Sequence, residues 1–148
     1  MCSPNVKSVQ PARRTVLTSS QDFDARSWDA ATGKPLELFR GHFGPVSDVA
    51  ISEDGRWVAT AGPISAGLWA AATGRLVFYL RGHTGQLRSV DFSPDGKQIL
   101  TASLDGTVRT YSCEICGNLP QLVTLARERL ERTSSALTAT QRARYLGG

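Results

Sequence analysis

The residues in this chain that could carry chemistry are two histidines, a set of threonines and aspartates, and three cysteines. A histidine beside a carboxylate and a hydroxyl can activate that hydroxyl as a nucleophile. His83, Asp105 and Thr101 supply these three groups. However, both histidines follow a glycine at the same position of a repeat, whereas an active site is normally built once. We therefore expect a structural role for these residues and no enzyme activity.

The segment CEIC, Cys113 to Cys116, has the spacing of redox and zinc motifs. A redox pair normally begins a helix within a βαβ unit, and a tetrahedral zinc site needs two further ligands. The sequence predicts no such unit and offers no second pair nearby, and three cysteines argue against a closed disulfide framework. We expect reduced, structural or incidental thiols, with no metal and no cofactor. A thiol redox or metal-dependent enzyme is the weakest alternative.

The chain repeats itself at an offset of 41 residues. The stretch GHFGPVSDVAISEDGRWVATAG begins at Gly41, and GHTGQLRSVDFSPDGKQILTAS begins at Gly82. An earlier copy, VLTSSQDFDARSWD, matches ILTASLDGTVRTYS position for position. Self-similarity at this period is the signature of a repeat architecture.

Each repeat divides into four short strands. VSDVAIS and LRSVDFS alternate between apolar and polar residues, which predicts the first strand, and RWVATA and KQILTAS predict the second. The Asp-Gly pairs between them suit a hairpin turn that requires positive φ. A third strand ends at Trp69 or Tyr111, and ATGK or ATGR leads into a fourth. Four antiparallel strands in about 40 residues make one propeller blade.

These motifs together resemble the WD-repeat β-propeller family over about Thr15 to Cys113. The resemblance rests on the Gly-His pairs, the Ser-Pro-Asp-Gly turn, the Asp-Gly-Thr-Val stretch and the Trp28–Asp29 dipeptide. It implies a rigid docking platform that generally has no catalysis of its own.

The resemblance also implies a hydrogen-bonded tetrad of His, Ser or Thr, Asp and Trp in each blade. The corresponding residues are Thr18, Asp22 and Trp28 in the first unit, His42, Thr60 and Trp69 in the middle unit, and His83, Thr101, Asp105 and Tyr111 in the last. None of the three tetrads is complete. The first lacks a His, and the middle unit has a shorter turn without an Asp. In the last unit Tyr111 stands at the Trp position, and its hydroxyl is placed differently from an indole N–H.

The fold class that follows is all-β: a partial propeller of about ten strands with a short α-helical C-terminal extension. We expect a disordered non-repeat segment at 1–14 and a propeller segment at 15–113, divided into a partial blade at 15–40, a full blade at 41–81 and a partial blade at 82–113. Apolar residues at helical spacing predict a helical tail over 114–148. The order of motifs in this tail resembles the end of bacterial WD-repeat proteins.

About two and a half blades do not close a ring, because propellers close with roughly four to eight. An open arc exposes blade faces and strand edges, which favour association. Three explanations are open: the C-terminal portion of a longer propeller, which we favour, self-association of two or three copies, or completion of a partner's ring.

The function that we expect is a noncatalytic protein-interaction scaffold in a cytoplasmic, bacterial signalling or regulatory protein. The expected partner-contact residues lie in loops on one face of the ring: Gln21, Phe43, Pro45, Gln86 and Leu104. No apolar run is long enough for a membrane helix. The net charge of +4 and the arginine-rich tail leave binding to nucleic acid or another anionic surface as a less favoured alternative.

Overall fold

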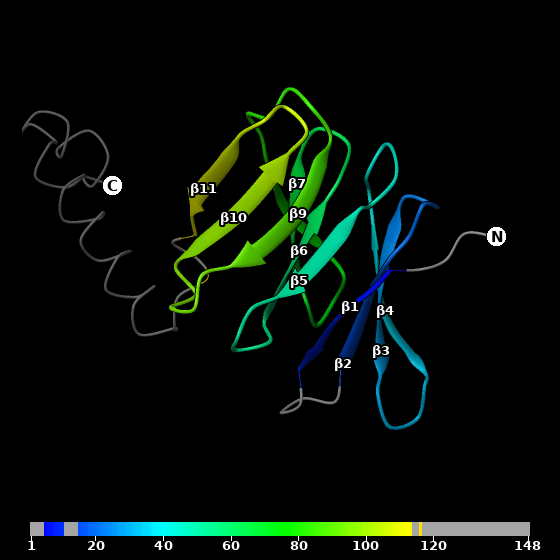
Figure 1. Ribbon diagram of the computed structural model, residues 1–148. Helices are drawn as coiled ribbons and strands as arrows, with labels where there is room; N and C mark the ends of the chain where they lie inside the picture. The colour runs from blue at the N-terminus through cyan, green and yellow to red at the C-terminus, as the bar shows by residue number, and fades with distance from the viewer. Residues whose placement is uncertain (1–4, 11–14, 114–115, 117–148) are drawn as a thin grey trace, which may run out of the picture. The chain divides into compact units, whose positions relative to one another are not determined.

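The computed structural model describes residues 5–10, 15–113 and 116. These residues form eleven β-strands in three antiparallel sheets, with no α-helix among them (Figure 1). The chain divides into two compact units, Met1–Cys116 and Gly117–Gly148, and the second lies wholly outside the described residues. The predicted helical tail therefore lies outside them too, except for Cys116. No helix in the described ranges is long and apolar enough to cross a membrane.

We name the three sheets blade 1, blade 2 and blade 3 in chain order. Blade 1 contains β1 (Asn5–Gln10), β2 (Thr15–Ser19), β3 (Asp24–Asp29) and β4 (Pro35–Arg40). Blade 2 contains β5 (Asp48–Ile51), β6 (Trp57–Ala61), β7 (Ala66–Ala70) and β8 (Leu76–Leu80). Blade 3 contains β9 (Leu87–Phe92), β10 (Gln98–Ser103) and β11 (Val108–Ser112). Within each blade, strands that are consecutive in the chain pair with each other.

The turn residues explain why the chain reverses at the same points in each repeat. Gly55 and Gly96 follow an aspartate between the first two strands of their blades, and both have a φ of 68°. In each turn a serine hydroxyl donates to the aspartate carboxylate, from Ser52 to Asp54 and from Ser93 to Asp95. The predicted Asp-Gly turns are confirmed, because glycine adopts this backbone conformation without a steric penalty.

Blade 1 corrects the prediction for the N-terminal segment. Residues 1–14 were expected to lack regular structure, but Asn5–Gln10 form β1, which pairs with β2 from Asn5 opposite Ser19 to Gln10 opposite Thr15. The first blade therefore has four strands, and the total is eleven instead of about ten. The strand β1 is defined by its pairing with β2. Its own sequence has no repeat motif, so a comparison of repeat motifs does not reveal it.

Blade 2 packs against a neighbour on both of its faces. On one face, Val49, Val58 and Trp69 join a buried cluster with Leu17 and Phe39 of blade 1. On the other face, small side chains dominate, and Ala59, Ala61 and Leu68 pack against Leu87, Val90 and Ile99 of blade 3. The core thus consists of two apolar seams between blades.

A buried carboxylate ties blade 2 to blade 3. Asp48, which is 1% exposed, accepts hydrogen bonds from the Ser89 hydroxyl at 2.8 Å and the Val90 amide at 3.1 Å. β5 and β9, which carry these residues, lie side by side (Figure 1). Bonds to charged acceptors are stronger than neutral ones, so Asp48 fixes the register between the blades.

The two cysteines that follow β11 form a disulfide, Cys113–Cys116. Their Cα atoms are 5.2 Å apart, and the Cys116 amide donates to the Cys113 carbonyl at 3.1 Å. This tight turn brings the two thiols within bonding range. The expectation of reduced thiols is therefore wrong for this pair in the structure.

Candidate functional site

Both histidines lie in loops that enter a blade, and a glycine of unusual backbone conformation precedes each of them. Gly41 has a φ of 153° and Gly82 a φ of 132°. A Cβ at Gly41 would lie 2.9 Å from the Tyr79 hydroxyl oxygen, and one at Gly82 would lie 3.0 Å from the Arg109 guanidinium. Glycine is required for this close approach, and the Gly-His pair delivers each histidine into its blade.

In blade 3, both ring nitrogens of His83 have partners. Nδ1 lies 2.8 Å from Asp105 Oδ2, and Nε2 lies 2.8 Å from Thr101 Oγ1. The carboxylate of Asp105 also accepts hydrogen bonds from the Thr84 amide and from the Thr107 amide and hydroxyl. The Thr107 hydroxyl, helped by His83 and the two amides, holds the pKa of Asp105 well below its ordinary range. The carboxylate therefore stays ionised.

In blade 2, His42 has the hydroxyl partner but no carboxylate. Its Nε2 lies 2.6 Å from Thr60 Oγ1, and the Trp69 indole N–H donates to the same hydroxyl at 2.8 Å. Within the described residues, Nδ1 of His42 has no hydrogen-bond partner. Burial lowers the pKa of His42 to about 4, so the ring is neutral at pH 7.

The remaining tetrad residues make simpler contacts. In blade 1, the Trp28 indole donates to Thr18 Oγ1 at 2.9 Å, while Asp22 pairs with Arg26 at 2.8 Å instead of a histidine. In blade 3, the Tyr111 hydroxyl donates to the Arg81 carbonyl at 3.2 Å. The Trp–Thr bond thus occurs in blades 1 and 2, whereas the His–Asp contact occurs in blade 3.

The His83 arrangement has the composition of a nucleophilic triad but not its access. Thr101 is 2% exposed and His83 is 7% exposed. A substrate carbonyl must come within about 3 Å of the nucleophile, whereas the Thr101 hydroxyl belongs to a residue that is almost fully buried. The geometry therefore fits a clamp that holds the loop before β9 against β10.

Five loops form one connected surface, which we call the loop face. It comprises residues 20–23, 41–47, 62–65, 81–86 and 104–107. Backbone hydrogen bonds join neighbouring loops from Val46 to Ser20 at 3.0 Å and from Leu104 to Gln86 at 2.9 Å. The amide of Leu87, the first residue of β9, donates to the carbonyl of Gly62 at 3.3 Å. The blades therefore present their loops together as one surface.

The loop face contains the expected partner-contact residues. Phe43 is 96% exposed and Leu104 is 59% exposed, and Gln21 and Pro45 are also exposed. Gln86 is half-buried, and its carbonyl accepts a bond from the Leu104 amide. Exposed phenylalanine and leucine side chains gain free energy when another surface covers them.

Sequence reasoning missed two apolar residues of the loop face, Phe23 and Ile64. Ile64 is 63% exposed and lies in the shortened loop of blade 2. Phe23 is 46% exposed and has a φ of 77°, a left-handed conformation that is rare for a bulky residue. The motif match could have revealed Phe23, because SQDFD aligns with SLDGT and places it at Gly106, whose φ is 79°.

A cavity of about 440 Å³ opens in the loop face between the two histidines. We call it the His42 pocket; the residues that line it are His42, Phe43, Pro63, Ile64, Ser65, Tyr79, Arg81, Gly82 and His83. Arg81 is the only lysine, arginine, aspartate or glutamate among the described residues that line it. The pocket therefore combines an apolar rim with one positive charge.

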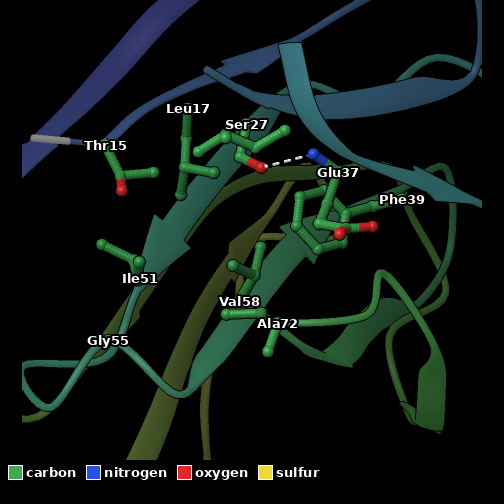
Figure 2. Close-up of a pocket in the computed structure, with 11 residues that line it drawn as sticks. Thr15, Leu17, Ser27, Glu37, Phe39, Ile51, Gly55, Val58 and Ala72 are labelled. Atoms are coloured by element: carbon green, nitrogen blue, oxygen red, sulfur yellow. Dashed lines mark hydrogen bonds between the residues drawn. The ribbon is translucent and has the colours of Figure 1, made fainter. Parts of the chain in front are cut away.

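A second cavity, of about 490 Å³, lies between blades 1 and 2 (Figure 2). Leu17, Phe39 and Val58 form part of its wall and also belong to the buried seam between these blades. The Ser27 hydroxyl lies at its edge and accepts a hydrogen bond from the Glu37 amide at 3.0 Å (Figure 2). Because its wall is continuous with the core, this cavity is the open end of a packing seam. We therefore place the candidate site on the loop face.

Comparison with known proteins also finds a repeat in this part of the chain. The family model described as "WD domain, G-beta repeat" matches residues 33–65 and 74–112. A serine-threonine kinase receptor-associated protein of Gallus gallus is 36% identical over 56 residues, and its Homo sapiens counterpart is 34% identical. These 56 residues are 38% of this chain but only 16% of the length of those curated relatives. The matches support the WD-repeat family for the repeat region.

Proposed function

We propose that this chain, with WD repeats at 33–65 and 74–112, forms part of a β-propeller that acts as a noncatalytic scaffold for protein–protein interaction. The partner contacts the loop face. The scaffold belongs to a larger signalling or regulatory protein of bacterial type, which the order of motifs in the tail supports. WD repeats generally mediate protein interactions, and the relatives' printed name, a protein associated with a kinase receptor, is compatible with a signalling role.

The observation that carries this proposal is the exposure of apolar side chains on the loop face. Phe23, Phe43, Ile64 and Leu104 are all large, apolar and at least 46% exposed, and each comes from a different loop. Large apolar side chains exposed on one face support an interaction site there. Rigid strands hold the loops, so the surface needs little ordering when a partner binds.

The test is partner capture by the full 148-residue chain, with Phe43 and Leu104 both replaced by alanine. We expect the double variant to capture much less of the partner in a crosslinking experiment than the wild type does, while its circular dichroism spectrum stays unchanged. The matched control replaces Phe78 and Leu76, which are 36% and 40% exposed on β8, away from the loop face. Unaltered capture by the first variant, or equal loss by the control, would contradict the assignment.

We also propose that further blades complete the ring. In blade 2, Ala59, Ala61 and Ala66 are fully buried against blade 3. The register of blade 3 places Leu100, Ala102 and Val108 at the same positions, yet Val108 is 69% exposed. The outer face of blade 3 is thus shaped like a buried face but is open at Val108. Another blade would cover it.

Light scattering over a series of concentrations separates the sources of those blades. The leading proposal, in which they belong to the same longer protein, predicts a monomer that aggregates without a discrete size as concentration rises. A discrete dimer or trimer would show instead that copies of this chain complete one another. A partner chain that supplies blades would convert the aggregating sample into a complex of defined mass.

We place the protein in the cytoplasm, and the disulfide offers a direct test of that placement. Cytosolic proteins usually keep their thiols reduced. Alkylation inside intact cells before lysis tests whether the disulfide is kept there, because a cytosol that reduced it would leave Cys113 and Cys116 open to the reagent. A pair that resists alkylation in cells would place the protein in an oxidising compartment.

A further inference from the structure

The two histidines differ in one respect that points to a ligand. Asp105 lies 2.8 Å from Nδ1 of His83 and accepts its proton, so Nε2 accepts the Thr101 hydroxyl. The hydroxyl oxygen of Thr60 lies nearer to Nε2 of His42, at 2.6 Å, than to the Gly67 carbonyl, at 3.4 Å. A Thr60 hydroxyl that donates to Nε2 leaves the proton of the neutral ring on Nδ1. No acceptor among the described residues forms a hydrogen bond with that nitrogen. An N–H without an acceptor loses the free energy that His83 gains from its carboxylate.

The loop of blade 2 explains why no acceptor is present. The segment Gly62–Ser65 closes with a bond from the Gly62 amide to the Ser65 carbonyl at 3.0 Å, and it is one residue shorter than the loop that carries Asp105. Ile64 stands 41 positions before Asp105, where the repeat would place the carboxylate. The space beside His42 is therefore open, and it belongs to the His42 pocket.

The pocket also contains a cation, Arg81. Arg81 is exposed, lines the pocket, and forms no ion pair within the described residues. The Arg109 guanidinium lies beside Gly82, another lining residue. Arginine next to a neutral N–H donor is a favourable site for a carboxylate, which accepts bonds from both. A single negative charge matches Arg81 better than a phosphate of nearly two charges.

We propose that the His42 pocket binds an aspartate or glutamate side chain of a partner peptide, whose carboxylate pairs with Arg81 and accepts the Nδ1 proton of His42. The ligand thereby occupies the place that Asp105 has at His83. The exposed rings and methyl groups of Phe43 and Ile64 contact an apolar residue beside the acidic one. This inference rests on the proposed scaffold function and states the chemistry of its partner.

The test measures binding of two pools of capped hexapeptides to the full chain by fluorescence anisotropy. The pools are identical except that one has a central Asp or Glu and the other an Asn or Gln, each beside Phe or Leu. We expect the acidic pool to bind at least about tenfold more tightly. The R81Q variant should lose most of this preference. The R88Q variant removes the same charge from an exposed position on β9 outside the pocket, and it should retain the preference.

A second measurement identifies the nitrogen involved. The chain has only two histidines, so their ring ¹⁵N signals can be assigned separately. Addition of the acidic pool should shift the Nδ1 signal of His42 and leave that of His83 unchanged, because Asp105 already occupies that position. Both I64D and I64N remove the methyl contacts of Ile64, but only I64D supplies an internal carboxylate, so I64D should weaken acidic-pool binding more than I64N does.

Several outcomes would overturn the inference. They are no binding of acidic peptides, equal binding of the two pools, equal losses in R81Q and R88Q, or a His42 signal that does not respond. Tighter binding of a phosphoserine pool would assign the pocket to phosphopeptides instead. If protein capture still depends on Phe43 and Leu104 in any of these cases, the scaffold function stands and only the acidic specificity fails.

Discussion

Blade 2 and blade 3 place the same pair of residues, a histidine and a threonine, in different surroundings. At His83 an ionised carboxylate completes the contact, and the site holds two loops of blade 3 together. At His42 an indole takes part through Thr60, and the ring packs edge-on against Trp69 and Tyr79. Blade 3 thus relies on a carboxylate at its histidine, whereas blade 2 relies on aromatic packing. The same repeat position can therefore stabilise the fold in blade 3 and leave a hydrogen-bond donor available for binding in blade 2.

The largest expected effect comes from the aromatic residue at the end of the third strand. Trp69 is 1% exposed, donates to Thr60 and packs edge-on against Phe39, whereas Tyr111 at the same position of blade 3 is half-buried. We expect Trp69→Ala to lower the free energy of unfolding by about 4 kcal/mol and Tyr111→Ala by about 1 kcal/mol. Urea denaturation measures both. Equal losses would contradict a core role that is specific to blade 2.

A methyl group at Gly62 should disturb blade 2 through His42. A Cβ at this position would overlap the Nδ1 atom of His42, while blade 3 has Ser103 at the corresponding position. We expect Gly62→Ala to lower the free energy of unfolding by about 2 kcal/mol, because the ring must move in a packed site. In a His42→Ala background the same change should cost much less. An unchanged cost would mean that the histidine is not the obstacle.

The two histidine sites should lose stability in different pH ranges. The unfolded chain protonates His42 near its ordinary pKa of 6.5, whereas the folded chain does so only near 4. Since the unfolded state binds the proton first, the free energy of unfolding should fall as pH drops from 6.5 to 4, by about 1.5 kcal/mol. Thermal melts of the wild type and of His42→Gln measure this, and the variant should lack the slope in that range.

The contribution of Asp105 to stability should be lost at a lower pH than that of His42. The pKa of this carboxylate in the folded chain is below its ordinary value of 3.8, so its contribution is complete above that pH and is lost as pH falls further. Asp105→Asn should therefore lower stability at pH 7 and remove part of the loss below pH 4. A variant that changes the slope between pH 6.5 and 4 instead would show that the two sites are coupled.

The smallest expected effect comes from the strained turn of blade 1. Phe23 adopts a φ of 77°, where blade 3 uses Gly106. Phe23→Gly should raise the free energy of unfolding by about 1 kcal/mol, because glycine adopts this conformation without strain. Gly106→Phe, which introduces the same strain in blade 3, should lower it. If Phe23→Gly also weakens partner capture, the Phe23 side chain contacts the partner on the loop face, in spite of the strain in its backbone.

Local chemistry in the sequence determined most of the architecture. The 41-residue repeat, the alternation in β5 and β9, and the Asp-Gly turns at Gly55 and Gly96 predicted the strands of blades 2 and 3. These features act over a few residues, so they can be recognised without a partner strand. The two Gly-His pairs marked the loops that enter the blades for the same reason.

Contacts between distant residues were decided only by the tertiary structure. β1 has no repeat motif and is defined by its pairing with β2, and the Cys113–Cys116 disulfide depends on how the chain turns after β11. The neutral state of His42 results from its burial beside Trp69 and Tyr79, and the pocket at its edge results from a loop one residue shorter. The residues were visible in the sequence, but burial and unpaired donors are properties of the packed chain. Burial and unpaired donors arise only when the blades pack against one another.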